Sequence, residues 1–93
     1  RDASVSSSAT VDTSVVGAGA VIGDGAEVSR SVVMDGAVVE AGATVSRSIV
    51  GGDATVHNGA TLADLSVVGF GATVAPNASL RGATAPEPSE WNV

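Results

Sequence analysis

The chain repeats every 17 residues, and this period constrains its fold more than any other feature of the sequence. Successive blocks begin at Val11, Val28, Val45 and Leu62, and the last block is one residue longer, with Leu65 as the insertion. Within a block the aliphatic residues recur at intervals of five, six and six. A fixed period of this kind indicates a solenoid, in which each turn contacts only its neighbours.

Two other positions of the six-residue unit are equally regular. The third residue after an aliphatic position belongs to a type that tolerates a positive φ angle, as follows: Gly19, Gly25, Gly36, Gly42, Asp53, Gly59, Gly71 and Asn77. The next residue is always alanine. Alternate residues of a strand face the same side, so this alanine and the aliphatic residue two places later share one interior. Three such strand-and-corner units per turn predict an all-β, triangular parallel β-helix of about four and a half turns.

The remaining corner of each turn is one residue shorter in three of the four blocks, and an inward-facing serine lies there. These serines are Ser14, Ser31, Ser48 and Ser66. We expect them to form a column inside the corner, hydrogen-bonded to the backbone or to one another.

The repeat ends before the end of the chain. We predict a β-helix over residues 1–82 and a C-terminal capping tail over residues 83–93. Pro86 and Pro88 cannot continue a central strand. Trp91 is the one large ring available to cover the last turn.

Composition excludes several classes of function. The absence of cysteine excludes disulfides, thiolate metal sites and cysteine nucleophiles. Ten acidic residues against four arginines and no lysine give a net charge of −6, which repels nucleic acids and anionic membranes. No apolar run approaches the roughly 20 residues of a membrane span, and no secretory signal opens the chain. The sequence therefore predicts a soluble, cytoplasmic domain without a nucleic-acid or membrane partner.

The glycine-rich stretch VVGAGAVIGDGAEV, from Val15 to Val28, suggests a loop that binds phosphate. A dinucleotide-binding fingerprint needs G-x-G-x-x-G at the start of a helix. Here Gly17 and Gly19 are followed by Ile22 in place of the third glycine, and no helical pattern follows. We therefore predict no cofactor-binding residues in this chain.

The hexapeptide pattern aliphatic-x-x-Gly-Ala-x, in turns such as SVVGAGAVIGDGAEVSRSVVMDGAVVEAGAT, resembles the left-handed β-helix at the C-terminus of sugar-phosphate nucleotidyltransferases, the NDP-sugar pyrophosphorylases such as mannose-1-phosphate guanylyltransferase. The resemblance covers about residues 3–82 and implies a left-handed helix with a structural, oligomerising or regulatory role. It also implies a parent reaction in which an NTP and a sugar 1-phosphate give an NDP-sugar and pyrophosphate, with Mg²⁺ as the cofactor.

In that family catalysis belongs to an N-terminal α/β domain with a glycine-rich nucleotide loop and basic residues at the phosphates. This chain has no such loop and no lysine. We therefore expect a C-terminal domain whose catalytic part is absent from this chain. Its expected partners are its own catalytic N-terminal domain, further copies of itself in a homo-oligomer, or both.

His57, the single histidine, occupies an outward position in VHNGAT. Hexapeptide acyltransferases share the repeat and use a histidine as a general base, so one alternative is a trimeric acyltransferase with His57 as its catalytic residue. The simpler interpretation is a solvent-facing polar side chain, because the sequence shows no accompanying acid. A stand-alone structural scaffold is a third alternative.

Metal binding is not predicted. A structural or catalytic zinc site needs three or four ligands, and the chain has one histidine and no cysteine. Asp24, Asp35 and Asp53 lie near corners but do not fall in one column, and no calcium-loop spacing links them. Turn chemistry explains them better.

An outward column of aliphatic residues follows the short corner. Val15, Val32, Ile49 and Val67 each precede an inward aliphatic residue, so they must point away from the interior. Met34 occupies the next outward position of its turn. Comparable positions on the other faces include threonine and glutamate. We predict that these five residues form an interface.

Overall fold

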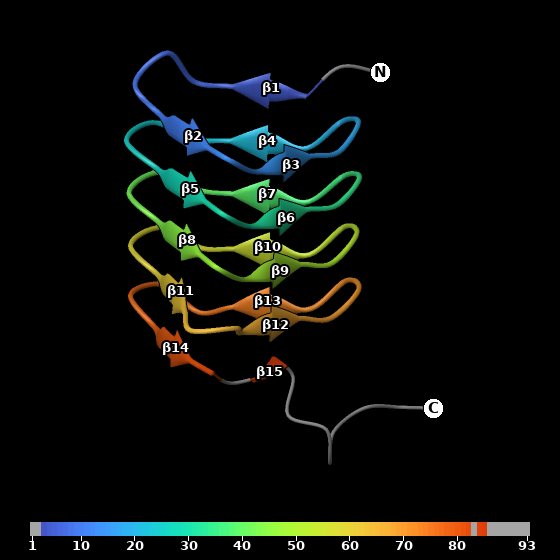
Figure 1. The fold of residues 1–93 in the computed structure, drawn as a ribbon, viewed down its shortest axis with the longest axis vertical. Coiled ribbons are helices and arrows are strands. Elements are labelled where there is room, and N and C mark those ends of the chain that lie inside the picture. Colours follow the sequence, from blue (N-terminus) through green and yellow to red (C-terminus); the bar gives the residue numbers. More distant parts are fainter. Residues whose placement is uncertain (1–2, 83, 86–93) are drawn as a thin grey trace.

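The computed structural model describes residues 3–82 and 84–85, which form a parallel β-solenoid of stacked turns (Figure 1). Its three parallel sheets give it a triangular cross-section. The chain passes through three sheets in each turn, and the turns stack along one axis, which we call the solenoid axis. Sheet A contains β1 (Ser4–Val5), β4 (Val21–Ile22), β7 (Val38–Val39), β10 (Thr55–Val56) and β13 (Thr73–Val74). Sheet B contains β2 (Thr10–Asp12), β5 (Glu27–Ser29), β8 (Thr44–Ser46), β11 (Thr61–Ala63) and β14 (Ser79–Arg81). Sheet C contains β3 (Val15–Val16), β6 (Val32–Val33), β9 (Ile49–Val50), β12 (Val67–Val68) and β15 (Thr84–Ala85).

The predicted fold class is confirmed. Each sheet has five parallel strands, so the solenoid has about five turns. β1 begins the stack and β15 adds a last strand to sheet C beside β12. The described residues contain no helix long and apolar enough to cross a membrane.

Equivalent residues of successive turns lie over one another. In sheet A, Ile22 pairs with Val39 and Val39 with Val56, and all three side chains are buried. The backbone links the turns as well, for example through the N–H of Val21, which donates to the carbonyl of Ala37 at 2.9 Å. Six of the predicted inward alanines are fully buried: Ala20, Ala26, Ala37, Ala43, Ala54 and Ala60. The core is thus narrow columns of alanine and valine.

The residues predicted to face the interior do so in every turn, but those of the first turn are not buried. Val5 and Val11 follow the inward pattern, yet they are exposed. The reason is that each turn is covered by its neighbours, and among the described residues the first turn has a neighbour on one side only.

The eight predicted corner residues all have positive φ angles, from 56° at Asp53 to 75° at Gly36. The short corner also contains left-handed residues, which the sequence did not reveal. Thr13, Arg30 and Arg47 have φ angles of 51°, 49° and 49°. The shorter corner still needs a left-handed residue. For a residue with a β-carbon, the left-handed backbone conformation costs about 1–2 kcal/mol of conformational free energy. The structure therefore retains arginine at a backbone conformation that favours glycine.

The inserted residue lies at this same corner, one turn further along. Asp64 and Leu65 both have positive φ angles there, 58° and 71°, and Leu65 projects into solvent. The longer corner thus absorbs the insertion without disturbing the sheets on either side, because β11 and β12 remain in register with their neighbours.

The predicted serine column forms a hydrogen-bonded ladder inside the short corner. The hydroxyl of Ser31 donates to the carbonyl of Ser29 at 2.7 Å and accepts the N–H of Ser48 at 3.0 Å. Ser14 makes the same pair of bonds one turn earlier, to the carbonyl of Asp12 and from the N–H of Ser31. Ser31, Ser48 and Ser66 are buried. Each hydroxyl therefore supplies the backbone bond that the shortened corner would otherwise lose.

The predicted capping elements cannot be compared with the fold. Pro86, Pro88 and Trp91 lie outside the described residues. Of the predicted tail, the structure describes only the strand β15, which continues sheet C.

The serine ladder yields a stability prediction. Ser31→Ala removes the acceptor of the buried Ser48 N–H, and we expect the free energy of unfolding to fall by about 1–3 kcal/mol. Ser46→Ala is the matched control, because its half-buried hydroxyl bonds to no described residue, and its effect should stay within about 0.5 kcal/mol. Urea denaturation followed by circular dichroism measures both. Equal losses would contradict a role for the ladder.

Candidate functional site

The outward side of sheet C carries a continuous aliphatic column. The strand register places Val15 beside Val32, Val32 beside Ile49, and Ile49 beside Val67. Val15, Val32 and Ile49 are exposed, and Val67 is half-buried. Parallel strands lie about 4.8 Å apart, so these side chains stand directly above one another along the solenoid axis. We call this surface, made of Val15, Val32, Ile49 and Val67, the sheet C face.

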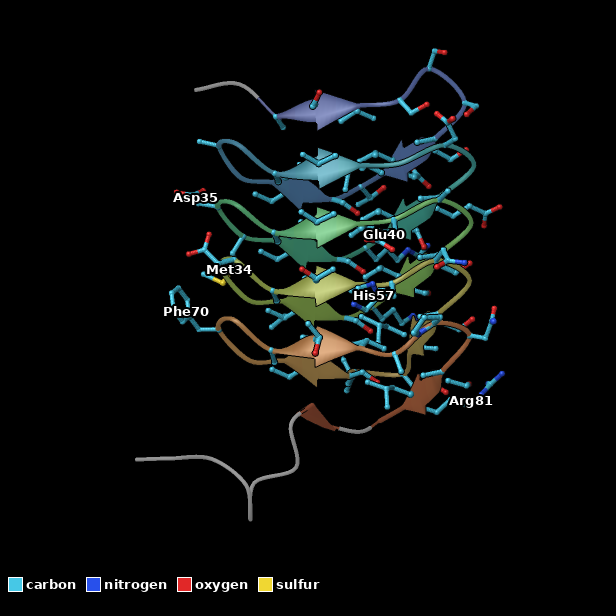
Figure 2. The ribbon with its side chains drawn as sticks, turned by 180° about the vertical axis from the view of Figure 1, so that it is seen from behind. Met34, Asp35, Glu40, His57, Phe70 and Arg81 are labelled. Atoms are coloured by element: carbon cyan, nitrogen blue, oxygen red, sulfur yellow. The ribbon has the colours of Figure 1, made fainter. Side chains whose placement is uncertain are left out.

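A groove runs along the sheet C face and ends at the corner that leads to sheet A. Met34 and Phe70 project from this corner, as Figure 2 shows, and both line the groove together with the aliphatic column. Phe70 is 78% exposed, more than any other large apolar residue that the structure describes. A β-carbon at Gly52 would lie 3.2 Å from the Phe70 ring, so glycine lets the ring approach the preceding turn closely. The result is an apolar groove with an aromatic border.

Phe70 is a member of this surface that the sequence prediction missed. The repeat alone could have placed Phe70 at this corner, because it is the equivalent of Ala18, Asp35 and Gly52 in the earlier turns. The single phenylalanine of the chain therefore stands at an outward position, next to the predicted interface.

The other faces are less apolar along their length. Sheet A carries Val21 and Val38 outward in two turns but Thr55 and Thr73 in the next two. The two valines of sheet A were not included in the sequence prediction. Sheet B presents mainly threonine, serine and charged residues. Of the three faces, only that of sheet C has an aliphatic side chain in each of four successive turns.

The aspartates near the corners act on the backbone. One carboxylate oxygen of Asp35 accepts the N–H of Ala18 at 2.9 Å, one turn earlier. Asp24 accepts a hydrogen bond from the Ser6 hydroxyl, and Asp53 occupies a left-handed corner. These contacts agree with the predicted turn chemistry.

Within the described residues, no three histidine, aspartate or glutamate side chains lie together as a metal site. The Mg²⁺ implied for nucleotidyl transfer therefore has no fitting ligand set there, and no step of that reaction is assigned to these residues.

His57 has an acidic neighbour that the sequence prediction did not identify. Its Nδ1 lies 3.1 Å from Oε1 of Glu40, and the same oxygen accepts the N–H of Asn58 at 3.1 Å. The two side chains are about one-third exposed, at 36% and 38%, and lie together on one side of the solenoid (Figure 2). The 17-residue period could have predicted this contact, because Glu40 precedes His57 by 17 residues, which is one turn.

Comparisons with known proteins are consistent with this architecture. The search of curated proteins found no match. Among solved structures, the acetyltransferase domain of PglB from Neisseria gonorrhoeae FA1090 is similar, with a TM-score of 0.57 and 24% sequence identity over 89% of this chain. The match covers 50% of that chain, so this chain spans half the length of its structural neighbour, and at this identity the likeness shows the fold alone.

The sequence also matches a family of left-handed β-helix (LbH) domains. The family model described as the EIF2B subunit epsilon LbH domain matches residues 1–80. The match supports the predicted left-handed hexapeptide-repeat helix. Because the match spans most of the chain, the protein belongs to the family of EIF2B subunit epsilon LbH domains.

Proposed function

We propose that this β-helix is an assembly domain that holds nucleotidyltransferase-like subunits together through the sheet C face. The observation that carries the proposal is the exposed aliphatic column of sheet C, bordered by Met34 and Phe70. Contiguous exposed apolar surface is a mark of interaction sites in proteins. The family supports the proposal too, because its description names a domain of a subunit.

Burial of this surface provides the driving force. Removing an aliphatic or aromatic side chain from water contributes about 1.5–3 kcal/mol when burial is complete. Here the exposed groups stand on a rigid scaffold, since every strand of sheet C is hydrogen-bonded to a neighbouring strand. Little conformational entropy is then lost when a partner covers them, which favours binding.

The parent reaction of the proposal is nucleotidyl transfer from an NTP to a sugar 1-phosphate, with release of pyrophosphate. We assign that chemistry and its Mg²⁺ to a catalytic domain outside this chain. The sequence supports this division of labour, because it lacks the glycine-rich nucleotide loop that the catalytic domains of sugar-phosphate nucleotidyltransferases carry. The β-helix then positions catalytic domains or regulates them.

The assembly role predicts that charge on the sheet C face abolishes association. We expect the wild-type chain to show an average mass in sedimentation equilibrium that rises with concentration, and Val32→Asp and Ile49→Asp to remain monomeric. Val21→Asp is the matched control, because Val21 on sheet A is 40% exposed, close to 36% for Val32 and 43% for Ile49. A wild-type chain that stays monomeric up to millimolar concentration would refute the proposal.

A second candidate function is acyl transfer, and the contact between His57 and Glu40 favours it. A carboxylate at Nδ1 orients the imidazole ring, so that Nε2 can accept a proton from an attacking hydroxyl or amine. Both residues lie at the surface, where an acceptor can reach them.

This candidate predicts measurable turnover of an acyl-CoA with a hydroxyl or amine acceptor. His57→Ala should reduce the rate by about 10²–10⁴-fold, because a general base contributes that much. Glu40→Gln should give a smaller loss, since it retains an oxygen that can accept the N–H of Asn58. No turnover by the wild-type chain, or equal turnover by His57→Ala, would remove this candidate.

A further inference from the structure

In two successive turns the sheet C face has a positive edge, and in the next turn Asp64 holds the same corner position, 4.0 Å from Arg81. Arg30 and Arg47 lie at the short corner between sheets B and C, one turn apart, and they line a shallow groove together with Val32, Ile49 and Leu65. Both arginines are exposed. Neither forms an ion pair with any residue that the structure describes, although the chain carries a net charge of −6. Two cations thus stand unpaired beside the aliphatic column.

The opposite edge of the same face is negative. Asp35 and Asp53 lie at the corner between sheets C and A, and they line the apolar groove together with the same Val32 and Ile49. Both carboxylates are in exposed residues. Along the chain, Arg30 and Asp35 flank Val32, while Arg47 and Asp53 flank Ile49. Each of these two turns therefore presents a cation, an aliphatic side chain and an anion in that order across the face.

From this order we propose that the sheet C face docks a second copy of the chain, with a two-fold axis parallel to the solenoid axis. The inference rests on the proposed assembly role and specifies its partner and orientation. Arg30 then lies opposite the partner's Asp35, and Arg47 lies opposite the partner's Asp53. The two solenoids run in the same direction along the axis.

The alternative two-fold arrangement conflicts with the charges. An axis parallel to the strands would turn the second solenoid upside down and leave its positive edge over the first positive edge. Arginine would then face arginine, and aspartate would face aspartate. Like charges placed together across an interface disfavour the wrong arrangement, whereas complementary charges fix the orientation. The apolar column thus supplies the attraction and the two charged edges select the direction.

The size of the face sets the strength of the contact. Five strands about 4.8 Å apart make a face roughly 20 Å high, and six residues at about 3.3 Å each limit its width to roughly 20 Å. Such a face, about 400 Å² in projection, is half of the roughly 800 Å² per partner in a stable complex. We therefore expect a weak and reversible dimer, observable at high micromolar concentration.

Charge exchange at one turn tests the orientation. Arg30→Asp should raise the dimer dissociation constant about tenfold, because two attractive pairs become repulsive, and Asp35→Arg should do the same. An equimolar mixture of the two variants should restore association, since each variant then meets the opposite charge on its partner. The double variant Arg30→Asp/Asp35→Arg should also associate like the wild type. Sedimentation equilibrium at low ionic strength measures all four, since salt screens exposed pairs.

Two controls separate loss of charge pairing from loss of fold. Aspartate tolerates the left-handed φ of 49° at position 30, so Arg30→Asp places no strain on the corner. Asp35→Asn retains an acceptor for the Ala18 N–H while removing the charge, and we expect it to weaken the dimer less than Asp35→Arg. Circular dichroism spectra of all variants should match the wild type, and so should the unfolding midpoints of Arg30→Asp and Asp35→Asn, whereas Asp35→Arg loses the acceptor of the Ala18 N–H and should unfold slightly earlier.

The outcomes distinguish this inference from the proposed function. If Ile49→Asp abolishes association but the mixture of single variants stays monomeric, the orientation is wrong and the assembly role stands. If Arg30→Asp strengthens association, the inverted two-fold arrangement replaces the proposed one. A trimeric mass overturns the two-fold arrangement. A strictly monomeric wild type overturns the assembly role, and this inference with it.

Discussion

The structure depends on the stacking of identical corners and strands at a spacing of one turn. Each strand is too short to bury anything alone, and its backbone donors and acceptors find their backbone partners in the turns above and below. Because the pairing is parallel and in register, each residue meets its own equivalent in the next turn, for example Val28 beside Val45. A residue type that suits its position in one turn is therefore found again in the next turns, and so is a residue type that strains the backbone.

This constraint explains both the interior and the surface. Inward columns can hold only small or branched aliphatic side chains, since three sheets converge on a narrow space, and alanine fills the positions nearest the corners. Where a corner is one residue short, serine hydroxyls take over backbone hydrogen bonds. Outward columns follow the same rule, so valines that precede the inward positions become a continuous apolar face instead of scattered exposed residues. Arg30 and Arg47, which are one period apart, form one edge of that face, and Asp35 and Asp53 lie along its other edge.

Prediction from the sequence succeeded where a position is determined by its own turn. The inward residues Ile22 to Val74, the buried serines and the eight left-handed corners follow from strand alternation and from the preferences of glycine, asparagine and aspartate. It failed where the outcome depends on a neighbouring turn. Arg30 and Arg47 adopt positive φ angles against their own preference, because the stacked sheets dictate the path of the short corner. Val5 and Val11 match the inward pattern but lack a covering turn among the described residues.

The candidate sites, too, were partly predictable from the sequence and partly decided by contacts between turns. By itself the sequence determined the period, the inward and outward faces, and hence the aliphatic column of the sheet C face, because alternation along a strand is a local property. Only the tertiary structure decided which residues of different turns meet. It brought Glu40 to His57, laid Phe70 against Gly52, and placed arginine and aspartate on opposite edges of one face. The physical reason is that the contacts of His57 and Phe70 run along the solenoid axis, between residues a full turn apart, and that the two charged edges lie at different corners of the triangle.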